Sequence, residues 1–76
     1  MIVHMTNAQF ETATVNRLRE LGFNGECSIK VERDYVSWAV RPKYAQNSAV
    51  VGLYMKKPIT VEGVAKAAFN AAVAQG

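Results

Sequence analysis

Apolar residues recur at helical spacing in the first third of the chain, directly after a helix-start signal. Thr6 followed by Gln9 is a capping-box pattern, in which each side chain bonds a free amide at the beginning of a helix. At the other end, Gly22 supplies a residue that tolerates positive φ, and Phe23 stands where the closing turn needs an apolar contact. This pattern predicts a helix over about residues 7–21.

The hydrophobic period then changes from about 3.6 to 2, which is typical of half-exposed strands. Three such segments follow: "ECSIKVE" at 26–32, "YVSWAVR" at 35–41 after a tight turn at 33–34, and "SAVVGLYMK" at 48–56. Their short connections predict an antiparallel meander. The middle segment directs one apolar set to a single side of the sheet, namely Val36, Trp38 and Val40.

A second helix is predicted at the end of the chain. Pro58 ends the third strand because it has no amide to donate to the ladder, and Thr60 is a good N-cap for an alanine-rich helix over about 61–74. The predicted fold class is therefore α+β, with residues 1–76 as a single compact domain. Its order is α-β-β-β-α, with a three-stranded antiparallel meander and both helices packed on one face. The other face is left to water or to a partner.

Composition supports a folded chain and argues against disulfides, a cysteine-based metal site and a membrane span. Half of the 76 residues are hydrophobic and 20% are charged, which is globular rather than disordered composition. Cys27 is the only cysteine, so there is no internal disulfide and no cysteine-based zinc site, which points to a reducing compartment. No secretory signal and no apolar run of about 18 residues are present. The sequence predicts a cytoplasmic protein without membrane association.

Residues that could carry catalysis do not form a set. His4 has no second histidine and no nearby carboxylate in sequence, and Cys27 is predicted to pack on the inner face of its strand. The glycines are scattered rather than gathered in a phosphate-binding loop. We therefore expect no enzymatic activity, no cofactor and no metal site.

Charge is uneven along the chain, because the net charge of +3 divides into −1 for residues 1–40 and +4 for residues 41–76. Alternation predicts one exposed sheet face that holds Lys30, Tyr35, Arg41 and Tyr54, with Gly52 leaving room beside Tyr54. The following loop, "RPKYAQN", adds Lys43 and Tyr44. Such a surface can dock a protein or stack bases and neutralise phosphates, or its tyrosines can simply pack across strands.

Lys56 and Lys57 stand just ahead of the second helix, whose free amides and dipole attract anions. "KKPIT" is therefore a candidate contact for phosphate or for an acidic partner. The meander also brings these lysines toward Glu32 and Asp34, which would neutralise them, and a charged strand end discourages edge association. Both interpretations stay open on the sequence alone.

The element order resembles that of a double-stranded RNA-binding domain, and so do the "KK" and "AKAAFNAA" pieces of the last helix region. The long loop between the first two strands of that family is replaced here by the tight "ERDY", and the family's lysines lie inside the helix start rather than ahead of a proline. The resemblance is one of topology, and no residue role is carried over from it.

The sequence predicts a small non-enzymatic binding protein, such as a regulator or a phage or mobile-element inhibitor, that docks on a larger protein or nucleoprotein complex. The alternative is a nucleic-acid-binding module that uses the basic second half, and a homodimer is a third possibility. The candidate partner-binding residues are Tyr35, Arg41, Lys43, Tyr44 and Tyr54. Further candidate contacts to phosphate or to an acidic partner are Lys30, Lys56 and Lys57.

Overall fold

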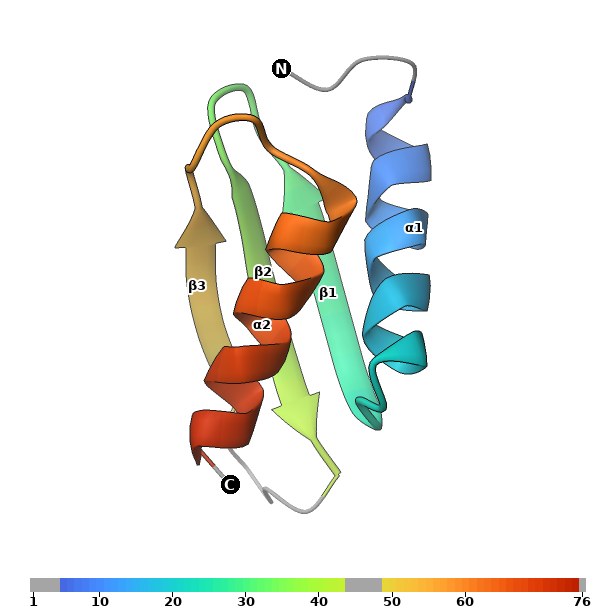
Figure 1. Cartoon of the computed structure of the whole chain (residues 1–76), viewed down its shortest axis with the longest axis vertical. Helices are drawn as coiled ribbons and strands as arrows, with labels where there is room; N and C mark the ends of the chain where they lie inside the picture. The colour runs from blue at the N-terminus through green and yellow to red at the C-terminus, as the bar shows by residue number, and fades with distance from the viewer. Residues whose placement is uncertain (1–4, 44–48, 76) are drawn as a thin grey trace.

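A computed structural model describes residues 5–43 and 49–75 and confirms the predicted fold class. The elements are α1 (Asn7–Glu20), β1 (Gly25–Val31), β2 (Val36–Pro42), β3 (Val50–Tyr54) and α2 (Val61–Gln75). The strands form one antiparallel sheet in the order β1-β2-β3. Both helices cover the same face of this sheet, with α1 along β1 and α2 across β2 and β3 (Figure 1). The opposite face carries no other element in the described ranges.

Local signals set both ends of α1. The Gln9 amide donates to Thr6 Oγ1 at 3.0 Å and the Thr6 amide donates to Gln9 Oε1 at 2.9 Å, so the predicted capping box is present. At the end of the helix, Gly22 adopts a φ of 100° and the Phe23 amide donates to the Leu18 carbonyl at 3.0 Å. This bond is the 6→1 hydrogen bond of a Schellman motif, and Phe23 is buried beneath it.

The core lies between the sheet and the two helices. The inward residues of β1 and β2 pack against the apolar stripes of α1 and α2 as one cluster. This cluster includes Phe10, Leu18, Ile29, Val31, Val36, Trp38, Val40, Val64, Ala65, Ala68 and Ala72. The buried residues of α2 are mostly alanines, and their small side chains leave room in the core for the wide indole of Trp38.

The orientation of β3 differs from the prediction. Tyr54 stands opposite Val36 in the ladder, is half-buried and belongs to the core cluster, so it faces the helices. The prediction that Tyr54 shares the exposed face with Tyr35 and Arg41 is therefore wrong. Both alternating sets of "VVGLYM" are apolar, so periodicity alone does not choose between them.

Cross-strand packing makes the choice. Gly52 stands opposite Trp38, and a Cβ built at Gly52 would lie 2.5 Å from the Trp38 ring carbon Cζ2. The indole therefore requires the residue without a side chain on the inner face of β3. Val51 and Leu53, on either side of Gly52, are consequently turned outward, with exposed fractions of 71% and 58%.

Candidate docking surface

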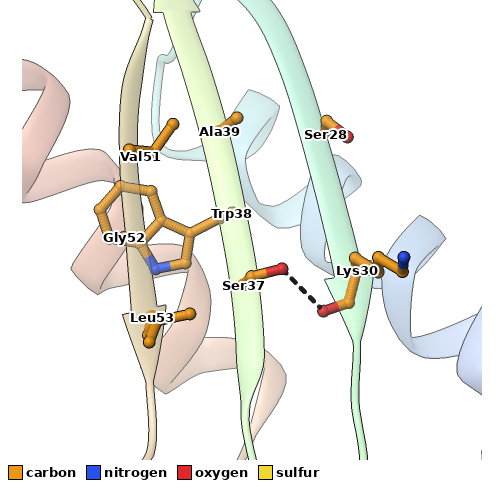
Figure 2. A pocket seen from close by; sticks show the side chains of 8 residues that line it. All are labelled: Ser28, Lys30, Ser37, Trp38, Ala39, Val51, Gly52 and Leu53. Carbon is orange, nitrogen blue, oxygen red and sulfur yellow. Dashed lines mark hydrogen bonds between the residues drawn. The ribbon is translucent and has the colours of Figure 1, made fainter.

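The sheet face that points away from the helices is here called the open face. Alternation along the three strands places on it Glu26, Ser28 and Lys30 of β1, Ser37, Ala39 and Arg41 of β2, and Val51 and Leu53 of β3. Figure 2 shows the central part of this face with its side chains. The face is continuous across all three strands because the register aligns its residues in rows.

The centre of the open face is lined by small side chains. Ser28, Ser37 and Ala39 form the floor of a shallow hollow of about 380 Å³, and Val51 and Leu53 flank it on the β3 side (Figure 2). The Ser37 hydroxyl donates to the Lys30 carbonyl at 3.5 Å, so this polar group is directed along the sheet rather than outward. The result is a mostly apolar concavity that a protruding side chain of a partner can enter.

Apolar residues gather along the β3 rim of this face. Met55, directly after β3, is 63% exposed. Val51, Leu53 and Met55 are three of the five large hydrophobic residues that are exposed in the described part of the chain. Isolated exposed hydrophobic residues are ordinary, whereas a contiguous row beside a hollow is typical of interaction sites. The sequence prediction missed these residues because it put Tyr54 on the exposed face, and the alternating set therefore fell on the other side. Trp38 opposite Gly52 is the signal that indicates their true orientation.

The basic residues of the open face are paired with carboxylates. Arg41 Nε donates to Glu26 Oε1 at 3.0 Å, across the β1–β2 ladder. Lys30 Nζ lies 3.6 Å from Glu32 Oε2. These pairs are exposed and add little stability, but they do offset the positive charge that the sequence predicts for this face. Tyr35 precedes β2 on the Arg41 side of the alternation and is half-buried.

Of the two predicted loop residues, Lys43 lies away from the open face and Tyr44 is outside the described residues. Lys43 follows β2, and its amide donates to the Asn24 carbonyl at 3.2 Å. Its side chain lines a separate hollow of about 430 Å³ with Phe23 and Phe69, between the end of α1 and α2. Tyr44 lies outside the described residues. The structure therefore does not bring Lys43 together with the open face.

The two lysines ahead of α2 are exposed, and Lys57 lines one hollow together with Glu32 and Asp34. The predicted approach to these acidic residues is present for Lys57, although no salt bridge within 4.0 Å joins them in the described chain. One backbone amide in the first turn of α2 already has a partner within the chain, since the Gly63 amide donates to Thr60 Oγ1 at 3.0 Å. Glu62 adds a negative charge to the same turn. An anion at "KKPIT" would meet these groups, so phosphate binding there stays a prediction.

Cys27 is half-buried on the inner side of β1, as predicted. Burial raises the pKa of the Cys27 thiol, and the nearby Arg19 charge opposes this only in part. The thiol therefore remains protonated and weakly nucleophilic near neutral pH. Among residues 5–43 and 49–75, no three side chains of His, Cys, Asp or Glu gather as metal ligands.

Comparison with known proteins adds no assignment, since no protein-family model, no curated protein and no solved structure matches this chain. Neither helix in the described ranges has the length and apolar character needed to cross a membrane.

Proposed function

We propose that this chain is a small non-enzymatic binding protein that docks on a larger protein through its open face. The observation that carries the proposal is the exposed row of Val51, Leu53 and Met55 beside a hollow floored by small residues. Apolar residues of this size become stabilising when a partner removes them from water, at about 25 cal/mol per Å². A regulator or inhibitor, of the kind that phages and mobile elements encode, acts in this way by occupying a surface of a protein or nucleoprotein complex.

Charge pairing favours a protein partner over a nucleic acid at this face. Lys30 and Arg41 already face Glu32 and Glu26, so a phosphate backbone would have to compete with these carboxylates. Tyr54, predicted as a stacking platform for bases, packs toward the helices instead. An apolar rim with a small-residue floor is complementary to side chains of a protein, which is why we favour the docking interpretation.

The test is affinity capture from a lysate with the parent protein and two matched variants. Ala39→Arg places a long charged side chain in the middle of the open face, while Asn16→Arg makes the same charge change on the exposed side of α1. We expect a defined protein to be retained by the parent and by Asn16→Arg but lost with Ala39→Arg. Each variant is checked by circular dichroism for an unchanged fold.

Nuclease and salt treatments separate the alternatives. A protein partner held by apolar contacts remains bound after nuclease digestion and at moderate salt. Nucleic acid held by phosphate contacts is released, because its affinity falls steeply as the salt concentration rises. Capture that is equal for parent and Ala39→Arg contradicts docking through the open face.

A further inference from the structure

The two outer edges of the sheet differ in whether their backbone groups are already bonded. On β1, the Val31 amide donates to Glu11 Oε2 at 3.0 Å, and Arg19 Nη1 donates to the Gly25 carbonyl at 2.6 Å. Both side chains come from α1, which runs alongside this strand (Figure 1). The β1 edge is therefore closed at its two ends against another strand.

The direction of the backbone groups on the other strands follows from alternation. In an antiparallel ladder, successive residues bond to one neighbour and then to the other. The Val31 amide points away from β2, to Glu11 of α1, whereas the Glu32 amide donates to the Tyr35 carbonyl at 2.9 Å. Tyr35 and every second residue after it along β2 therefore bond to β1. The residues between them, Trp38 included, bond to β3.

On β3, the backbone hydrogen bonds to β2 are therefore made by Gly52, the register partner of Trp38, and by the residues two positions away from it. Val51 and Leu53 consequently direct their N–H and C=O groups to the outer edge. No side-chain hydrogen bond among the described residues reaches Val51 or Leu53 there, and β3 contains no proline, lysine or other charged residue to discourage pairing.

We propose that a second copy of this chain pairs with the open edge of β3, antiparallel and with the two-fold axis at Gly52. The pairing joins the two sheets into one of six strands. Val51 then stands opposite Leu53 of the second copy, and both satisfy each other's outward N–H and C=O groups. The proposal goes beyond docking through the open face and does not depend on it.

The side chains of this register are self-complementary. Val51 and Leu53 lie on the open face, so the two copies bring four exposed apolar side chains together in cross-strand pairs. Gly52 adds no side chain to the contact on the helix side, where the Trp38 indole of each copy packs against its own Gly52. Exposed area is thereby removed from water on both copies by a single symmetric contact.

Charge does not oppose this arrangement. Lys56 and Lys57 lie just beyond the end of β3, and antiparallel pairing puts the lysines of the two copies at opposite ends of the contact. They are then on the order of 20–30 Å apart. That separation exceeds the Debye length of about 8 Å at physiological salt, so their repulsion is screened.

The contact is small, which sets the expected affinity. Two five-residue strands bury less area than a standard interface of about 800 Å² per partner. We expect a weak dimer with a dissociation constant on the order of 10–100 μM. Sedimentation equilibrium from about 5 μM to about 1 mM covers the monomer and the dimer.

Amide exchange identifies the edge involved. With rising concentration, the amides of Val51 and Leu53 should become protected from hydrogen exchange. The amides of Gly52 and Tyr54 already bond to β2, so their protection should change much less. Self-association without protection of Val51 and Leu53 overturns the proposal.

A proline at Val51 removes an N–H that the monomer does not use, so Val51→Pro should leave the β2–β3 ladder intact while blocking the second copy. Val51→Thr is the matched control, because it keeps the N–H and the β-branched shape. We expect Val51→Pro to be monomeric over the whole concentration range and Val51→Thr to dimerise with a loss of no more than about tenfold in affinity. A dimer that persists in a folded Val51→Pro contradicts edge pairing.

Complementary charges test the register even if the proline variant does not fold. One chain carries Val51→Lys with Leu53→Lys, and the other carries Val51→Glu with Leu53→Glu. Each alone should be monomeric, because like charges face each other across the axis, and an equimolar mixture should restore the dimer. A mixture that stays monomeric overturns the proposed register.

A parent that stays monomeric at the highest concentration overturns the dimer. If it still captures a partner in a manner that depends on Ala39, the docking proposal stands by itself. If the Val51 and Leu53 amides become protected only when that partner is added, the edge receives a segment of the partner and the second-copy proposal is wrong.

Discussion

Replacement of Gly52 by alanine tests the packing that orients β3. The added Cβ would lie 2.5 and 2.6 Å from the Cζ2 and Cη2 carbons of Trp38, far inside ordinary van der Waals contact. The indole is only 7% exposed, so it cannot swing into solvent without leaving the core. Gly52 does not have a positive φ, so backbone strain plays no part and the cost is steric.

The magnitude follows from two opposing contributions. Overpacking a well-filled core by one methyl group costs about 1–3 kcal/mol. Alanine also gains roughly 0.5–1 kcal/mol over glycine in a strand, because it loses less backbone entropy on folding. We expect Gly52→Ala to lower the free energy of unfolding by about 1–2 kcal/mol, and each kcal/mol lowers the Tm by roughly 4–8 °C in a domain of this size.

Urea denaturation followed by circular dichroism measures this change, provided that the m-value is unchanged. The matched experiment repeats Gly52→Ala in a Trp38→Phe background, where the two closest ring carbons are absent. Trp38→Phe also removes the buried indole N–H, for which the described chain offers no hydrogen-bond acceptor. The cost of Gly52→Ala should fall by at least about 1 kcal/mol in that background. An equal cost in both backgrounds, or no cost in the parent, would refute the packing argument.

Three further changes test other parts of the fold. Thr6→Ala removes one bond of the capping box and should destabilise the chain by about 1 kcal/mol, read from the urea midpoint; an unchanged midpoint contradicts a stabilising cap. The Arg17 guanidinium lowers the pKa of Glu62, so this pair stabilises the fold above the ordinary carboxyl pKa and loses that effect as the pH falls through the lowered value. The difference in Tm between parent and Glu62→Gln should therefore shrink on acidification below about pH 4, and a constant difference contradicts the linkage. Because burial raises the pKa of Cys27, iodoacetamide should alkylate this thiol more slowly in the folded than in the urea-unfolded chain at the same pH, and equal rates contradict its protection.

Features that depend on a few neighbouring residues could be predicted from the sequence. The capping box at Thr6 and the Schellman motif at Gly22 act through backbone hydrogen bonds within one or two turns, and both are present. The strand period of two and the short turn at 33–34 likewise predicted an antiparallel meander, which the register confirms. The order α-β-β-β-α follows from signals of this local kind.

The candidate surface was only partly predictable. Lys30 and Arg41 lie on the open face as alternation required, but their pairing with Glu32 and Glu26 depends on side-chain positions across and along the strands. Lys43 lines a hollow on another side of the molecule, beside Phe69 of α2. No local pattern connects residues that far apart in the chain.

The sequence by itself determined the order of the helices and strands and placed their ends to within about two residues, because caps, turns and hydrophobic periods are read over short stretches of backbone. Only the tertiary structure decided which side of β3 is buried, since both of its alternating sets are apolar and either one can supply a hydrophobic face. The indole of Trp38 resolved that ambiguity by excluding any side chain from the position opposite, which is Gly52. Steric exclusion across the sheet thus turned Val51 and Leu53 toward solvent and created the surface that we propose as a docking site.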